Sequence, residues 1–145
     1  MFESAIGAVK QFDPESEAIQ ETALDYIDGY YSGDAARMQR AVHPELAKRI
    51  VKVDPTTGKS TLEQLDAGTL VEITRSGAGK IPENLRQEEV SILDRYRDAA
   101  VVKIVANDWI DFLEMAKVDG AWKIINVLWA LKPKPSKQRD NGTHP

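Results

Sequence analysis

The sequence predicts an α+β domain whose N-terminal helices pack on one face of an antiparallel sheet. Helix signals fill the first half of the chain, and the second half consists of β-rich runs separated by short turns. Helices followed by an antiparallel meander are typical of this fold class. The 145 residues, 42% apolar and 29% charged, suffice for one domain of ordinary globular composition. We expect this single domain to span residues 1–131, and residues 132–145, rich in proline and charge, to form a flexible tail.

Composition excludes several classes of site. The chain has no cysteine, so disulfides, thiolate nucleophiles and Cys-ligated metal centres are ruled out. Its two histidines, His43 and His144, are too few for a multi-histidine metal site, and we expect neither a metal nor a cofactor. A net charge of −4 argues against nucleic-acid binding through bulk charge. Residues 1–13 carry no secretion signal and no apolar run is long enough to cross a membrane, so we expect a soluble, cytoplasmic protein without membrane contact.

The first helix has the clearest boundaries. Asp13 fits the N-cap position, and Gly33 supplies the stop. Asp34 then caps a second helix, which Pro44 ends because the residue before a proline is pushed out of the α region. His43 is therefore expected at a helix end, where it either binds the last carbonyl groups or serves as an acid or base in a pocket. The apolar stripe of the first helix consists of Ile19, Ala23, Tyr26, Ile27 and Tyr30.

Tyr26 and Tyr30 lie one helical turn apart on the same face. One interpretation makes them core residues with their hydroxyl groups at the rim. The other makes them a pair of hydroxyl groups that line a pocket between helix and sheet. Tyr31 points to another side of the helix and is expected to be peripheral.

The middle of the chain gives weaker signals. Residues 49–53 form a stretch rich in β-branched residues, which predicts a short strand, and the turn sequence 54–58 follows it, leading to a second strand or to a helix. Ser60 with Glu63 matches a capping box, which predicts helical turns on either side of Gly68. Residues 76–82 predict a loop; its Gly-Ala-Gly-Lys sequence lacks the spacing of a phosphate-binding loop and is interpreted as a solvated turn.

Four β-rich runs make up the second half of the chain, at residues 90–93, 99–106, 109–118 and 122–131. Arg97-Asp98 and Asp119-Gly120 are hairpin signals between them.

Alternation along residues 109–118 places one carboxylate on each face of that strand, because Asp111 and Glu114 differ in parity. A carboxylate that faces the interior needs hydrogen bonds or has a raised pKa, which is how a general base is made. The alternative is a carboxylate near the sheet edge that reaches water. One face carries Trp109, Asp111, Leu113 and Met115, and the other carries Ile110, Phe112, Glu114 and Ala116.

Two segments resemble a known family. Residues 23–34, ALDYIDGYYSGD, followed by Val-His-Pro at 42–44, resemble the opening of the nuclear transport factor 2-like superfamily. Residues 111–129 are similar to the closing hairpin of its putative lumazine-binding, SnoaL-like branch. The resemblance covers residues 14–131. It implies a cone-shaped α+β barrel of cystatin-like type, in which a strongly curved antiparallel sheet and about three helices close a pocket.

The resemblance also implies positions for site residues. A comparison with ketosteroid isomerases in the superfamily places Tyr26 at the oxyanion-binding tyrosine and Ile50 at the general-base aspartate. Isoleucine cannot take a proton, so that isomerase mechanism is not expected. Strand parity matched to the family puts Glu114 and Trp129 on the pocket side and Asp111 outside. A slip of one residue would exchange the two carboxylates, so both remain candidates for one position.

Two functional hypotheses follow. In the first, the protein binds a small, largely apolar molecule, and His43 or the inward carboxylate (Asp111 or Glu114) acts as base in a proton transfer or in the addition or elimination of water. Tyr26 would donate a hydrogen bond to developing negative charge.

In the second hypothesis, the cavity is filled by its own side chains and the protein is an interaction module, with an interface formed by Trp109, Met115 and Trp122. The resemblance implies a homodimer through the sheet in either case. The pocket residues of the first hypothesis are Tyr26, Tyr30 and Trp129, with the candidate catalytic residues His43, Glu114 and Asp111.

Overall fold

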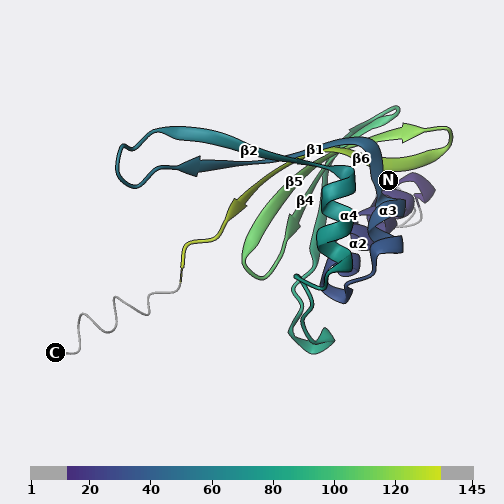
Figure 1. Ribbon diagram of the computed structural model, residues 1–145. Helices are drawn as coiled ribbons and strands as arrows, with labels where there is room; N and C mark the ends of the chain where they lie inside the picture. The colour runs from purple at the N-terminus through teal and green to yellow at the C-terminus, as the bar shows by residue number, and fades with distance from the viewer. Residues whose placement is uncertain (1–12, 135–145) are drawn as a thin grey trace, which may run out of the picture.

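A computed structural model describes residues 13–134 of the chain (Figure 1). This part of the chain forms three α-helices, one short 3-10 helix and one six-stranded sheet. The predicted α+β class is therefore confirmed. The helices are α2 (Pro14–Ser32), α3 (Ala35–Ala41), α4 (Ala67–Arg75) and the 3-10 helix η1 (Glu83–Leu85). The strands are β1 (Val42–Val53), β2 (Ser60–Asp66), β3 (Glu89–Tyr96), β4 (Ala99–Val105), β5 (Trp109–Val118) and β6 (Ala121–Leu131).

The sheet has the strand order β2-β1-β6-β5-β4-β3 and is curved, with all three α-helices on one side of it (Figure 1). Strands β3 to β6 form the expected antiparallel meander. Strand β1 pairs with β6 in parallel and with β2 in an antiparallel hairpin. The β1–β2 hairpin extends away from the helices as an arm (Figure 1). The interior that matters for function therefore lies between the helices and strands β1, β6 and β5.

The capping residues predicted from the sequence define the helix boundaries. The Asp13 carboxylate accepts a hydrogen bond from the backbone N–H of Glu15 at 3.0 Å, and Gly33 ends α2 in the left-handed region with φ 69°. Asp34 caps α3 by accepting from the backbone N–H of Arg37 at 3.1 Å. These local hydrogen bonds explain why both helices begin where the sequence indicates.

Two predictions in the middle of the chain are wrong. Ser60–Asp66 is a strand, because it pairs residue by residue with β1, and the helix begins only after Asp66, whose side chain accepts from the N–H of Thr69 at 2.9 Å. His43 does not lie at a helix end, because α3 stops at Ala41 and β1 begins with the next residue. Its Nδ1 accepts a hydrogen bond from the backbone N–H of Glu45 at 3.0 Å.

Tyr31 is a core residue and not peripheral, since only 2% of it is exposed. Its hydroxyl group accepts a hydrogen bond from the backbone N–H of Asn107 at 2.9 Å and lies 3.0 Å from the Asn107 side-chain oxygen. This contact joins the end of α2 to the turn between β4 and β5. The tail expected at residues 132–145 and the segment 1–12 lie almost entirely outside the described residues.

Asp28 of α2 lies in a cluster of charged residues that ties this helix to the segment before β3. It forms ion pairs with Arg37 and, at 2.8 Å, with Arg86. The Glu88 carboxyl group lies against Asp28, and its buried Oε2 has no hydrogen-bond partner among residues 13–134. Partial burial and the neighbouring Asp28 raise the pKa of Glu88 to about 7.

We expect Glu88→Gln to stabilise the protein at pH 8 but not at pH 5. Folded Glu88 holds its proton more tightly than the unfolded chain does, so its contribution to stability is lost as the pH rises from about 4.5 through about 7. The glutamine keeps the protonated form's shape at every pH. Because water screens this partly exposed group, the expected gain at pH 8 is about 1 kcal/mol. Urea unfolding at both pH values measures it, with exposed Glu83→Gln as control; an equal change at pH 5 would contradict the assignment.

Candidate functional site

Six side chains from four elements meet between α2 and the sheet, and we call this group the Asp111 cluster. Its members are Tyr26 and Tyr30 of α2, Lys48 of β1, Trp109 and Asp111 of β5, and Trp129 of β6. Four of them were singled out from the sequence as pocket or catalytic candidates. The structure thus brings together residues that are up to about 100 positions apart in the chain.

Asp111 forms the buried centre of the cluster, with 0% of the residue exposed. The indole Nε1 of Trp109 donates a hydrogen bond to its Oδ2 at 2.7 Å. Its other oxygen, Oδ1, is buried and has no hydrogen-bond partner in the described part of the chain. Burial raises the pKa of Asp111, and the nearby charge of Lys48 opposes this only in part. Asp111 is therefore a carboxyl group that can carry a proton at higher pH than an exposed aspartate.

Lys48 approaches Asp111 from β1. Its Nζ donates a hydrogen bond to the Tyr26 hydroxyl group at 2.6 Å and lies 5.1 Å from the centre of the Tyr26 ring and 5.2 Å from that of Trp129. It makes no direct ion pair with any carboxylate of residues 13–134. Burial of the ammonium group lowers the pKa of Lys48, and the negative charge of Asp111 opposes this shift.

Tyr26 lies between these two groups and is 1% exposed. Its hydroxyl group accepts from Lys48 and faces the carboxyl group of Asp111. Burial, and secondly the negative charge of Asp111, raises the pKa of Tyr26 well above its ordinary value. Tyr26 therefore keeps its proton and serves as a hydrogen-bond donor.

Three partly exposed rings, Tyr30, Trp109 and Trp129, form what we call the aromatic wall. The Tyr30 and Trp109 rings are 5.8 Å apart at 88°, and Trp109 and Trp129 are 6.4 Å apart at 78°. Both pairs have the edge-to-face geometry that aromatic rings prefer. Gly79 of the loop after α4 packs on Tyr30 so closely that a Cβ there would lie 2.2 Å from the ring. The loop that contains the Gly-Ala-Gly-Lys sequence thus holds Tyr30 in place.

The expectation that Glu114 faces the pocket and Asp111 lies outside is wrong. Glu114 is exposed on the outer face of the sheet, where its Oε1 accepts from Asn126 at 2.9 Å. The cause is a β-bulge in β6: Glu114 pairs with Asn126 but Met115 pairs with Ile124, which leaves Ile125 as the extra residue. Trp129 faces inward as expected, and so does Trp122. The bulge makes this possible, since strict alternation would place the two tryptophans on opposite faces.

His43 does not belong to the cluster. The neighbouring Val42 pairs with Ile124, whereas Asp111 pairs with Trp129, five residues further along β6. That separation corresponds to roughly 15 Å of strand. The structure therefore leaves Asp111 as the only one of the three candidate catalytic residues that lies in the interior.

Lys48 is the residue that sequence reasoning missed. The strand was expected to begin at residue 49, which left this lysine outside the pattern. In the structure Lys48 lies on the same face of β1 as Leu46 and Ile50, which are both buried. A lysine on the apolar face of a strand is the signal that would have identified it.

Two cavities lie near this part of the fold. One of about 420 Å³ opens where β1 and β6 separate beyond their last pair, Ile50 and Trp129, and both of these residues line it. Trp129 is the one member of the Asp111 cluster that lines it.

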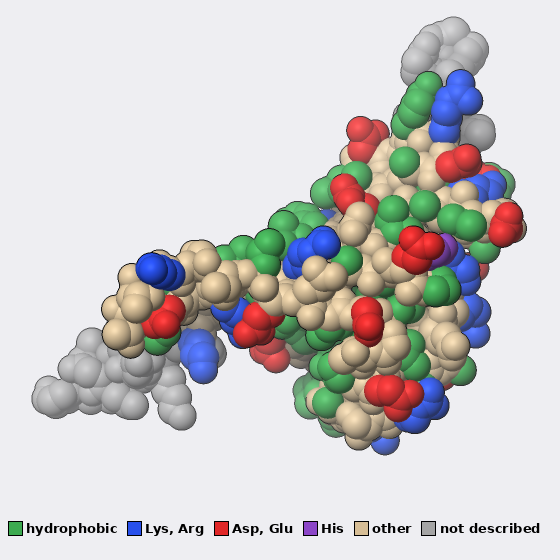
Figure 2. Space-filling model, turned by 45° about the horizontal axis from the view of Figure 1, so that its top comes forward, with side chains coloured by type: hydrophobic (Ala, Val, Ile, Leu, Met, Phe, Trp, Pro, Cys, Tyr) green, Lys and Arg blue, Asp and Glu red, His purple; other side chains and the backbone are tan. Residues whose placement is uncertain are grey.

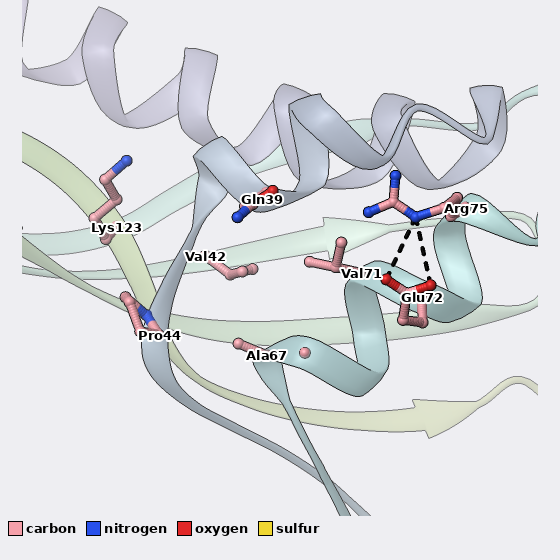
Figure 3. A pocket seen from close by; sticks show the side chains of 9 residues that line it. Gln39, Val42, Pro44, Ala67, Val71, Glu72, Arg75 and Lys123 are labelled. Carbon is pink, nitrogen blue, oxygen red and sulfur yellow. Dashed lines mark hydrogen bonds and ion pairs between the residues drawn. The ribbon is translucent and has the colours of Figure 1, made fainter.

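The other cavity, of about 540 Å³, lies between α3, α4 and the start of β1 (Figure 3). It contains no member of the cluster, and its charged side chains have partners: Arg75 pairs with Glu72 at 3.3 Å, and the Lys123 ammonium donates to the Arg40 carbonyl at 2.6 Å. The charged side chains of this cavity are therefore already paired, and the polar lining residue beside them is Gln39. Among residues 13–134 no group of three His, Asp or Glu side chains is placed to hold a metal ion.

Three helices on the concave side of a curved six-stranded sheet, with a polar cluster between them, define the NTF2-like class of α+β proteins. The chain belongs to the family described as "Putative lumazine-binding", whose model matches residues 14–130. The recognition of the superfamily and of this branch is thereby confirmed. A comparison with curated proteins finds no match. None of the described helices has the length and hydropathy needed to span a membrane.

Solved structures resemble this fold at low sequence identity. An NTF2-like protein of unknown function from Shewanella baltica has a TM-score of 0.64 at 21% identity, with 85% of this chain and 98% of that chain covered. Another, from Methylobacillus flagellatus, has a TM-score of 0.66 at 20% identity, with 83% and 94% covered. A domain with a cystatin-like fold from Nostoc punctiforme has a TM-score of 0.53 at 12% identity, with 88% and 83% covered. These similarities establish the fold alone.

Proposed function

We propose that the protein binds a small, largely apolar molecule at the Asp111 cluster and moves a proton to or from it. The observation that carries this proposal is the Asp111 carboxyl group, which is fully buried and has one oxygen without a hydrogen-bond donor in residues 13–134. A buried polar atom without a partner costs stability. Such atoms are rare in folded proteins and call for a specific explanation, of which an absent ligand is one.

The surroundings of Asp111 suit a ligand with an apolar body and one polar group. The aromatic wall offers ring faces and edges to the apolar body. Burial raises the pKa of Asp111, which favours a carboxyl group that gives or takes a proton. Tyr26, with Nζ of Lys48 2.6 Å from its oxygen, supports negative charge that develops on a ligand oxygen. The reaction class is therefore proton transfer, or the addition or elimination of water.

The binding part of the proposal is tested with a panel of small aromatic alcohols and ketones, by thermal shift and then by calorimetry. We expect Asp111→Asn to weaken the best binder about tenfold or more, because the ligand loses its charged or protonated partner. Glu114→Gln is the matched control, since it changes a carboxylate on the outer face of the same strand. If no compound binds, or if Asp111→Asn binds as well as the wild type, the proposal fails.

A second candidate function is an interaction module whose partner is a second copy of the chain. Apolar side chains gather on the outer face of the sheet near the base of the β1–β2 arm (Figure 2), around a groove of about 550 Å³. Arg49 and Glu114 line the same groove and have opposite charge. Two copies related by a two-fold axis would pair these charges reciprocally while burying the apolar side chains. The exposed apolar residues of this face are Val51, Leu62, Val101, Phe112 and Leu128.

Mass spectrometry of the purified protein separates the two candidates. A native spectrum reports the oligomeric state, and its difference from a denatured spectrum reports any small molecule that is retained. A retained molecule supports the binding function. A dimer without one, together with no binder in the panel, supports the interaction module.

A further inference from the structure

We infer that Lys48 is a nucleophile whose amine adds to the carbonyl carbon of an aldehyde or ketone and forms an imine with loss of water. The inference rests on the proposed function, since the carbonyl compound occupies the same site. It deepens that function by naming the class of ligand. It also gives a role to the one member of the Asp111 cluster that sequence reasoning did not find.

The position of Lys48 is the first argument. Its Nζ lies between the rings of Tyr26 and Trp129, at 5.1 and 5.2 Å from their centres, and its single hydrogen bond within the described residues goes to a neutral hydroxyl group. Lys48 is half-buried, and an ammonium group held between aromatic rings only as a fixed cation is expected to contact a carboxylate. Lys48 does not, although Asp111 lies close by. Burial also lowers the pKa of Lys48, with the charge of Asp111 opposing the shift, and a lowered pKa increases the share of free amine.

The second argument is the pair of proton-carrying groups beside the amine. Tyr26 is 2.6 Å from Nζ, and Asp111 faces the same hydroxyl group. Imine formation needs one proton on the carbonyl oxygen as the amine attacks, and a second proton when that oxygen leaves as water. Both donors are present on one side of the amine.

The step balances with these groups alone. The lone pair of Nζ forms a bond to the carbonyl carbon, and the π electrons move to the oxygen, which takes a proton from Tyr26. The nitrogen returns a proton to the tyrosine, which leaves a neutral carbinolamine. Protonated Asp111 then protonates the hydroxyl group, the C–O bond breaks, water departs, and the nitrogen lone pair forms the C=N bond. Loss of the remaining N–H proton to the Asp111 carboxylate gives the imine and restores the acid.

The proposed entry for the carbonyl compound is the cavity of about 420 Å³ between β1 and β6, where Trp129 is the lining residue that belongs to the Asp111 cluster. Trp129 lines that cavity and also lies against Nζ. The aromatic wall then selects a planar or apolar substituent on the carbonyl carbon. The chemistry points to an aromatic aldehyde or an aryl ketone.

The test uses benzaldehyde with sodium cyanoborohydride, which reduces an imine to a stable benzylamine. We expect an added benzyl group on Lys48 at pH 7, formed about tenfold or more faster than on Lys59, an exposed lysine between β1 and β2; peptide mapping by mass spectrometry measures both rates. Lys59→Met keeps the fast reaction, and Lys48→Arg, which retains the positive charge, loses it. Circular dichroism of Lys48→Arg verifies that the variant is folded, and Lys48→Met serves if it is not. Equal rates at the two lysines would overturn the inference.

Benzyl alcohol separates this result from the proposed function, because it has the same ring and no carbonyl group. Asp111-dependent binding of benzyl alcohol without fast labelling of Lys48 overturns the nucleophile and leaves the binding site intact. Absence of both binding and labelling overturns the two together.

Discussion

Replacing Asp111 with asparagine is expected to stabilise the protein at pH 8 by about 1–2 kcal/mol, even though it weakens ligand binding. The wild-type protein buries a carboxyl group that has lost water and gained too few donors. Asparagine accepts the same hydrogen bond from Trp109 and carries no charge. Gain of stability with loss of function is typical of a residue that serves a site and not the fold.

The pH dependence gives this prediction its signature. Because the pKa of Asp111 is raised in the folded state, its contribution to stability is present at low pH and is lost as the pH rises above the ordinary carboxyl range. The two proteins are therefore expected to differ little at pH 4 and increasingly above it. Urea unfolding at pH 4 and pH 8 measures this, with Glu114→Gln as control. Destabilisation of Asp111→Asn at both pH values would mean that the carboxylate is structural.

Trp122→Ala is expected to cost about 4 kcal/mol of the free energy of unfolding, which is the usual loss for a buried tryptophan. Trp122 is 4% exposed, and its indole Nε1 donates to the Glu15 carboxylate at 2.8 Å. Its carbonyl oxygen also accepts from the Thr22 hydroxyl group at 3.1 Å. The residue thereby anchors α2 on the β5–β6 hairpin, at the end of the fold opposite the aromatic wall.

Denaturant unfolding and the melting temperature measure this loss, and Trp122→Phe is the control. The phenylalanine keeps a large ring in the same space, so we expect it to lose about 1–2 kcal/mol. Alanine no more destabilising than phenylalanine would show that ring packing is not what holds the helix on the hairpin.

The parts of the fold that were predicted from the sequence depend on local interactions. Asp13 and Gly33 define α2 through contacts within a few residues, and Asp119-Gly120 forms its hairpin turn because both residues adopt positive φ. Ser60–Asp66 was mistaken for a helix because its local capping pattern is real, whereas its pairing with β1 is a long-range interaction.

The same distinction between local and long-range interactions explains which residues of the site could be predicted. Tyr26 and Tyr30 were identified because helical spacing places them on one face. Asp111 was assigned to the wrong side because a bulge in the neighbouring strand decides which partner each residue meets, and no local pattern shows which residue is extra. Lys48 was missed because the start of its strand depends on pairing with β6.

The bulge at Ile125 divides β6 into two segments. Even-numbered residues face the interior before the bulge, and odd-numbered residues face it after the bulge. Before it, Trp122 and Ile124 point toward the N-terminal part of α2; after it, Val127 and Trp129 point toward Asp111. If β6 paired without a bulge and kept all its residues, strict alternation would present Asn126 and Leu128 to the interior in place of the tryptophan. The bulge at one position thus decides whether this scaffold presents an aromatic binding surface or an aliphatic and amide one, while the contacts of the first segment stay the same.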